Sequence, residues 1–149
     1  MGNTNQNTYA DGKSNTVSNL NYDVALAEKL GADDYGMKNY IFVVFKAGAN
    51  QTTDQLFLNK KYRGHIDKIN LLVEQKRIVV AGSIGKNDNN YRGICILSDI
   101  TTFEEATEVL QTDPAVKAGL LDFELYNWYG SAALPEYLES LDKIWKVRI

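Results

Sequence analysis

Apolar residues from position 40 onward recur with two different periods, and each period predicts one kind of element. Residues 40–45 (YIFVVF) are apolar at odd and even positions alike, which predicts a strand covered on both faces. Thr52 and Gln55 match a capping box, and apolar side chains then follow at i+3 and i+4 spacing to about Gln75. This stripe predicts a long helix, and its members are Leu58, Tyr62, His65, Ile66, Ile69, Leu72 and Val73.

A β-hairpin is predicted after this helix. Residues 78–81 are β-branched or small and are followed by Gly82, which breaks the apolar run. The stretch KNDNN at 86–90 has turn composition and leads into a second apolar run at 91–97. We therefore expect two antiparallel strands joined by this turn.

A second helix is predicted from another capping box, Thr102 with Glu105, and the Asp113-Pro114 step should end it. Pro114 suits the first position of a further helical turn, which closes at Gly119. Alternation of apolar and polar residues then predicts a half-buried strand that starts at residue 121 and ends at Trp128. Short helices are expected near the two ends, at 22–30 with Asp23 as N-cap and at 135–144.

From residue 40 the order is thus β-α-β-β-α-β, the ferredoxin-like split βαβ arrangement of the α+β class. It implies a four-stranded antiparallel sheet with both helices on one face. We expect three parts: a polar N-terminal extension with a short helix at 1–37, the α+β domain at 38–129, and a C-terminal helical extension at 130–149.

The second face of the predicted sheet is also apolar. On the first strand Ile41, Val43 and Phe45 lie on one face, and the intervening residues on the other face are apolar too. A single chain rarely exposes so large an apolar patch. Pairing of two chains through these sheet faces, giving a dimeric α+β barrel, would cover it. Coverage by the C-terminal helix is the alternative.

The amino-acid composition mainly excludes classes of function. A net charge of -3 argues against nucleic-acid partners, since binding to phosphates needs a basic surface. One cysteine, Cys95, and one histidine, His65, offer no ligand cluster for zinc, so we expect neither metal nor other cofactor. No apolar run approaches the roughly 20 residues of a membrane helix, so no membrane span is expected.

The first residues, MGNTNQNTYADGKSNTVSN, are polar and without periodicity. Such a leader is typical of the region just after the processing site of a secreted or lipid-anchored protein, and equally of an ordinary ragged terminus. The expected compartment is therefore cytoplasmic or, if a signal has been removed, periplasmic or secreted.

Two side chains stand out as candidates for chemistry. His65 falls on the buried stripe of the long helix, where its role depends on its hydrogen-bond partner; a core histidine satisfied by a main-chain carbonyl is the simpler interpretation. Asp113 precedes a proline at a helix junction, and an N-cap would explain it fully. Ser83 ends a strand and could face a pocket. Cys95 lies within an apolar strand, where burial disfavours a nucleophilic thiolate.

From about Lys38 to Trp128 the chain resembles the YCII-related (YciI-like) domain family. The resemblance rests, in order, on YIFVVFKAG, RGHIDKINLLVEQKRIVVAGSIG, RGICILSDITTFEEATEVLQTDPAVKAGLLDFEL and YNW. It implies a ferredoxin-like fold, a dimeric α+β barrel, and an active-site pair made of His65 and Asp113. Many members carry an arginine and a proline where this chain has Tyr62 and Ser83.

Two functions follow as hypotheses. The first is a cofactor-independent enzyme of lyase, isomerase or hydrolase type, acting on a small organic molecule, with His65 as acid or base, Asp113 orienting it, and Ser83 and Tyr62 binding substrate. The second is a non-catalytic dimeric domain that binds a small ligand or serves as an accessory.

Overall fold

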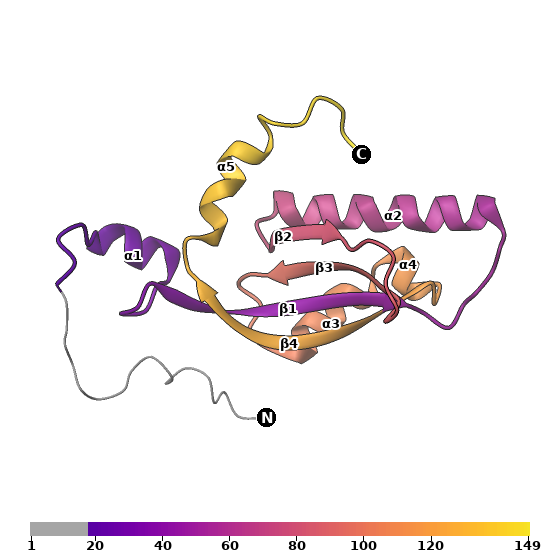
Figure 1. The fold of residues 1–149 in the computed structure, drawn as a ribbon, viewed down its shortest axis with the longest axis horizontal. Coiled ribbons are helices and arrows are strands. Elements are labelled where there is room, and N and C mark those ends of the chain that lie inside the picture. The colour runs from indigo at the N-terminus through magenta and orange to yellow at the C-terminus, as the bar shows by residue number, and fades with distance from the viewer. Residues whose placement is uncertain (1–17) are drawn as a thin grey trace.

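The centre of the structure is a four-stranded antiparallel sheet with the strand order β2-β3-β1-β4 (Figure 1). The structure is a computed structural model and describes residues 18–149; the first 17 residues of the expected N-terminal extension lie outside the described part. The strands are β1 (Met37–Ala47), β2 (Ile78–Ser83), β3 (Tyr91–Leu97) and β4 (Leu121–Ser131). This is an α+β fold with the ferredoxin-like strand order, as the sequence predicted.

The helices connect these strands in the predicted sequence of elements. They are α1 (Val24–Leu30), α2 (Gln55–Glu74), α3 (Phe103–Gln111), α4 (Pro114–Lys117) and α5 (Leu138–Leu141), with a 3-10 turn η1 (Leu134–Tyr137) before α5. The predicted cap of α1 is confirmed: Asp23 accepts a hydrogen bond from the Leu26 amide, and Gly31 ends the helix with φ at 70°.

The capping box predicted at Thr52 is wrong. Asp54 is the N-cap of α2, and its carboxylate accepts hydrogen bonds from the amides of Leu56 and Phe57. Asp54 directly precedes the first helical residue and so reaches two free amides, whereas the Thr52 hydroxyl accepts only from the Asp54 amide. The second predicted cap is confirmed, since Thr102 accepts from the Glu105 amide at the start of α3.

Several predicted boundaries differ from the observed ones, because strand pairing and packing, and not local pattern alone, decide where an element ends. Strand β2 continues past Gly82 because Ser83 still pairs with Gly93 of β3. Strand β4 runs beyond Trp128 because its last residue, Ser131, pairs with Met37 at the start of β1. The helix expected at 135–144 is instead a 3-10 turn followed by one helical turn.

The main core lies between one face of the sheet and the helices α2, α3 and α4. Ile41, Val43 and Phe45 of β1 are buried there, against Leu72 of α2 and Leu110 of α3. In Figure 1, α3 and α4 lie behind the strands. Burial of these apolar side chains stabilises the helices, because an isolated helix of this length is only marginally stable in water.

The opposite face of the sheet is covered at one end by the C-terminal segment. Leu134 and Leu138 pack against a buried cluster made of Tyr40, Val79 and Ile96. The C-terminal coverage that the sequence left as an alternative is thus present for this part of the face.

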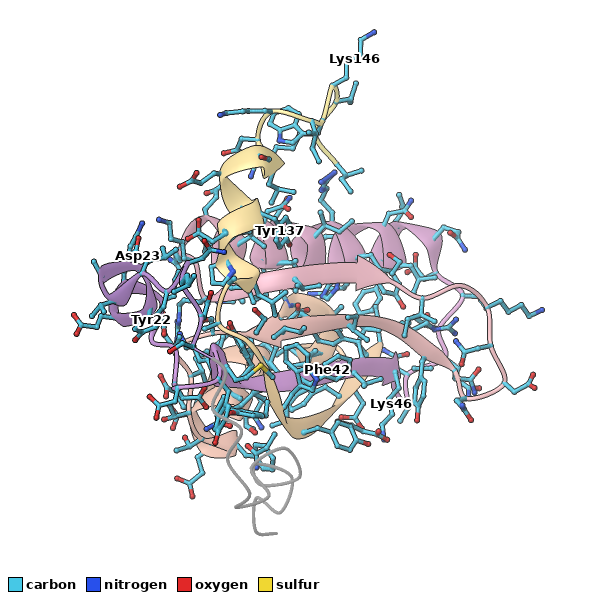
Figure 2. All side chains as sticks on the ribbon, turned by 60° about the vertical axis from the view of Figure 1, so that its left-hand side comes forward. Tyr22, Asp23, Phe42, Lys46, Tyr137 and Lys146 are labelled. Carbon is cyan, nitrogen blue, oxygen red and sulfur yellow. The ribbon has the colours of Figure 1, made fainter. Side chains whose placement is uncertain are left out.

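The remainder of that face carries a mixed set of side chains. Phe42 is half-buried and Tyr126, its partner in register on β4, is 50% exposed. Lys46, labelled with Phe42 in Figure 2, forms an ion pair of 3.1 Å with Glu124. The Tyr126 hydroxyl donates to the other oxygen of Glu124.

Candidate active site

Helix α2 carries His65 to the edge of the main core. Its inward face packs Phe57, Leu58 and Ile69 against that core, and His65 follows the same stripe. The imidazole meets the ring of Phe45 edge-on, with centroids 5.2 Å apart and planes at 84°. One of the residues that fixes this ring, Phe45, therefore comes from the sheet.

Asp113 is held at the start of α4. One carboxylate oxygen, Oδ1, accepts hydrogen bonds from the amides of Ala115 (2.9 Å) and Val116 (3.3 Å), so Asp113 is the N-cap of this short helix. Pro114 occupies the first helical turn, where no amide is needed. Asp113 is almost fully buried, at 1% exposure for the whole residue. The N-cap interpretation of the Asp-Pro step is therefore right, but it uses only one of the two oxygens.

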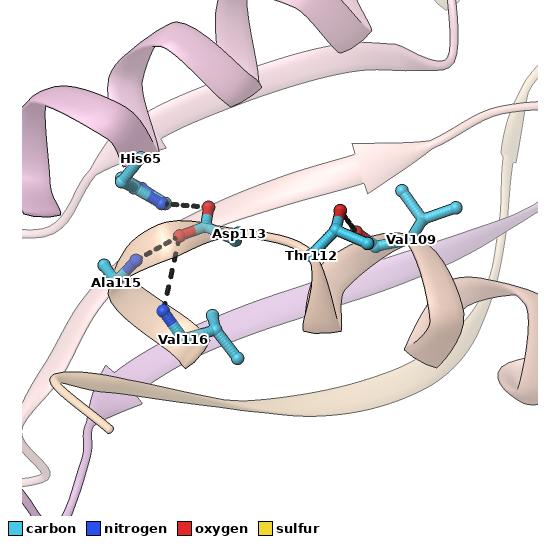
Figure 3. Close-up of polar contacts among 6 residues, drawn as sticks. All are labelled: His65, Val109, Thr112, Asp113, Ala115 and Val116. Atoms are coloured by element: carbon cyan, nitrogen blue, oxygen red, sulfur yellow. Dashed lines mark hydrogen bonds and ion pairs between the residues drawn. The ribbon is translucent and has the colours of Figure 1, made fainter. Parts of the chain in front are cut away.

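The second oxygen of Asp113 meets His65. Oδ2 lies 2.6 Å from Nδ1 of the imidazole, across 48 positions of sequence (Figure 3). An ionised carboxylate carries acceptors only, so we assign the proton of this hydrogen bond to Nδ1 and not to Oδ2. The structure thus brings together the two residues that the sequence nominated, one from each of two helices.

The outer nitrogen of the imidazole faces water. Within residues 18–149 no buried side-chain nitrogen or oxygen lacks a hydrogen-bond partner. The hydrogen bond of His65 to Asp113 uses Nδ1 and leaves Nε2 unbonded. Nε2 therefore reaches solvent, in keeping with the 19% exposure of the His65 side chain. An imidazole held at Nδ1 and open at Nε2 is arranged to accept a proton from an outside molecule.

Cys95 lies close to the pair but on its buried side. The thiol is fully buried, and burial together with the charge of Asp113 raises its pKa to about 12. It is therefore a thiol rather than a thiolate at ordinary pH, as its place in an apolar strand predicted.

The other nominated residues lie further out. Tyr62 is 37% exposed on α2, and Ser83 is exposed at the end of the edge strand β2. Neither forms a hydrogen bond with His65 or Asp113. Arg63, next to Tyr62, turns outward and pairs with Asp67 at 3.5 Å. A role of Tyr62 and Ser83 in binding substrate stays a prediction.

A hollow of about 480 Å³ lies elsewhere, between the outer face of α2 and the end of the chain. Arg148 and Ile149 form one wall, and Arg148 is bound to Glu74 of α2. Neither His65 nor Asp113 lines it.

The part of the chain that the structure describes contains no group of three or more His, Cys, Asp or Glu placed to hold a metal ion. Among its helices, none is both long enough and apolar enough to cross a membrane.

Taken together, fold and site define an α+β protein with a ferredoxin-like sheet and a His-Asp pair at the edge of its core. No protein-family model matches the chain, and no curated protein matches it. A solved structure that is similar is 5-chloro-2-hydroxyhydroquinone dehydrochlorinase (TftG) from Burkholderia phenoliruptrix AC1100, in complex with 2,5-dihydroxybenzoquinone. The match has 21% identity and a TM-score of 0.42, and it covers 59% of this chain and 92% of the other.

Proposed function

We propose that this chain is a YCII-like, cofactor-independent enzyme of lyase, isomerase or hydrolase type that acts on a small organic molecule. His65 is its general acid or base, and Asp113 orients the imidazole. The observation that supports this most directly is the 2.6 Å contact between His65 Nδ1 and Asp113 Oδ2, because it leaves Nε2 as the acceptor that faces solvent.

The proposed step is a proton transfer. Nε2 takes a proton from a carbon beside a carbonyl group, or from water, and the imidazole becomes positively charged. The Asp113 carboxylate stabilises that charge through the bond to Nδ1. In an isomerisation the imidazolium returns the proton to another carbon of the enolate. In an elimination the enolate expels a leaving group, which takes the proton from the imidazolium. In a hydrolysis the hydroxide formed from water attacks the carbonyl carbon, and the leaving group departs with that proton. General acid-base catalysis of this kind contributes a factor of about 10²–10⁴ in rate. Tyr62 and Ser83 are proposed to bind the substrate.

We further propose that the protein works as a homodimer. The uncovered part of the second sheet face carries apolar Phe42 and Ile94 beside the half-exposed Tyr126. The ion pair of Lys46 with Glu124 borders it. A second copy placing the same surface against this one would bury all of these side chains.

The experiment that tests the enzymatic proposal measures exchange of carbon-bound hydrogen for deuterium. The full chain is incubated in D₂O with a panel of carbonyl compounds comprising lactones, hydroxyquinones and enones, and exchange is followed by proton NMR. We expect accelerated exchange for at least one compound class. The His65→Ala variant should lose about 10²–10⁴-fold of this rate. Asp67→Ala, an exposed change on the same helix, is the matched control and should keep it.

Equal rates for His65→Ala and the unchanged protein would overturn the enzymatic proposal. A protein that exchanges nothing but binds a panel compound, seen as shifts of the His65 ring signals, would instead support the second hypothesis of a ligand-binding domain. Since His65 is the single histidine of the chain, those signals need no assignment.

A further inference from the structure

The contact between Gly64 and Pro114 bears on how His65 and Asp113 come together. Gly64 lies in the middle of α2, where glycine is less favourable than alanine by about 1 kcal/mol. A Cβ at this position would lie 2.7 Å from Cγ and 3.0 Å from Cβ of Pro114, well inside the 3.4 Å at which ordinary contacts begin. Glycine is thus what lets α2 lie directly against α4.

The two residues of this helix contact are the chain neighbours of His65 and Asp113. Gly64 precedes His65, and Pro114 follows Asp113. Asp113 cannot adjust independently of α4, because Oδ1 is bound to the amides of Ala115 and Val116. His65 is likewise held by α2 and by the ring of Phe45. The distance between the two helices at this point therefore sets the distance between Nδ1 and Oδ2.

We propose that Gly64 is a positioning residue, whose missing side chain brings α2 close enough to Pro114 for His65 to bond Asp113. The proposal rests on the proposed function only for its effect on turnover. A methyl group at position 64 pushes the two helices apart by several tenths of an ångström. Such a shift lengthens the 2.6 Å hydrogen bond toward the long, weak end of the ordinary range, because its two residues move with different helices.

The test reads the hydrogen bond itself, through long-range proton-nitrogen NMR of the single imidazole at mildly alkaline pH. In the unchanged protein we expect the proton on Nδ1 and a downfield Nδ1-H signal. In Gly64→Ala this signal moves upfield, because the hydrogen bond is longer and weaker. In Gly64→Ala/Pro114→Gly it moves back, because glycine carries neither the Cγ nor the Cβ that the new methyl group meets. Pro114→Gly and Asp67→Ala are controls that keep the signal of the unchanged protein.

Two results would overturn the proposal: a Gly64→Ala protein whose Nδ1-H signal is unchanged, or a change in that signal that the double variant does not reverse. The double variant also covers the case in which Gly64→Ala fails to fold, since relief of the contact should restore both the fold and the signal. With a substrate from the exchange panel, Gly64→Ala should lower kcat about 10²-fold. If the signal behaves as expected but no compound is turned over, the positioning role stands and the enzymatic proposal fails.

Discussion

Asp113 combines two structural roles in one carboxylate, and two substitutions separate them. Asp113→Asn keeps an oxygen for the amides of Ala115 and Val116 but presents an NH₂ group to His65, which forces the ring proton from Nδ1 to Nε2. Asp113→Ala removes both. We expect Asp113→Ala to lower the free energy of unfolding by about 1 kcal/mol more than Asp113→Asn, the usual worth of an N-cap.

Denaturant unfolding of both variants measures this difference, and nitrogen NMR reads the tautomer. Both variants should lose turnover. Equal stability of the two would mean that the cap contributes nothing to this helix. A proton retained on Nδ1 in Asp113→Asn would contradict the assignment of the hydrogen bond.

Cys95 gives a prediction that depends on pH. Its pKa is raised to about 12 by burial and by the charge of Asp113, so below that pH the folded protein holds the unreactive thiol. We expect a disulfide reagent such as dithionitrobenzoate to leave the folded chain unlabelled at mildly alkaline pH. In concentrated guanidinium, where the thiol is exposed with an ordinary pKa of about 8.5, labelling should be complete. Rapid labelling of the folded chain would contradict this burial.

At this scale the sequence could indicate which residues carry chemistry but not how they meet. The helical stripe placed His65 toward the core, and the Asp-Pro step placed Asp113 at a helix start. That these two side chains share a hydrogen bond depends on how α2 packs on α4, which no local pattern encodes. The resemblance to a family supplied that expectation.

At the scale of elements, the start of α2 shows how local signals compete. Both Thr52 and Asp54 have polar side chains that cap helices well, and the spacing to Gln55 favoured Thr52. The structure uses Asp54, which bonds the amides of Leu56 and Phe57. The order of the elements followed from the hydrophobic period. The capping residue did not, because Thr52 and Asp54 lie two positions apart and both are favourable N-cap residues.

This difference predicts that substitutions of Asp54 and Thr52 have unequal effects on the free energy of unfolding. Asp54→Ala should lower the free energy of unfolding by about 1 kcal/mol, which shifts Tm by about 2–4 °C in a chain of this size. Thr52→Ala should change it by less than about 0.5 kcal/mol, as expected for a surface change. Thermal unfolding of the two variants side by side makes the measurement. The reverse order of effects would restore the Thr52 capping box.

At the scale of the whole molecule, the second face of the sheet is where the sequence left the most open. Apolar residues on both faces of β1 required a cover, and either a second chain or the C-terminal segment could supply it. In the structure Leu134 and Leu138 of that segment cover Tyr40, Val79 and Ile96. The sequence pattern shows which residues need to be buried. Whether the same chain or a second copy buries them depends on tertiary and quaternary contacts.

The proposed homodimer concerns the part of this face that the segment leaves free. Sedimentation of the full chain should give a mass near twice the 16.7 kDa of one chain. Tyr126→Arg places a charge in the free part, opposite Phe42 in register. We expect it to weaken the dimer at least about tenfold, because aromatic side chains at an interface centre contribute strongly to binding.

Tyr35→Arg is the matched control, since Tyr35 is similarly exposed, at 62% against 50%, but lies in the turn before β1 rather than on the sheet. It should leave the mass unchanged. If the unchanged protein and both variants have the mass of one chain at every concentration, the dimer is wrong, and the pair of His65 and Asp113 must act within a single chain. If only Tyr126→Arg dissociates, the sheet face is the interface, and a second copy covers what η1 and α5 do not.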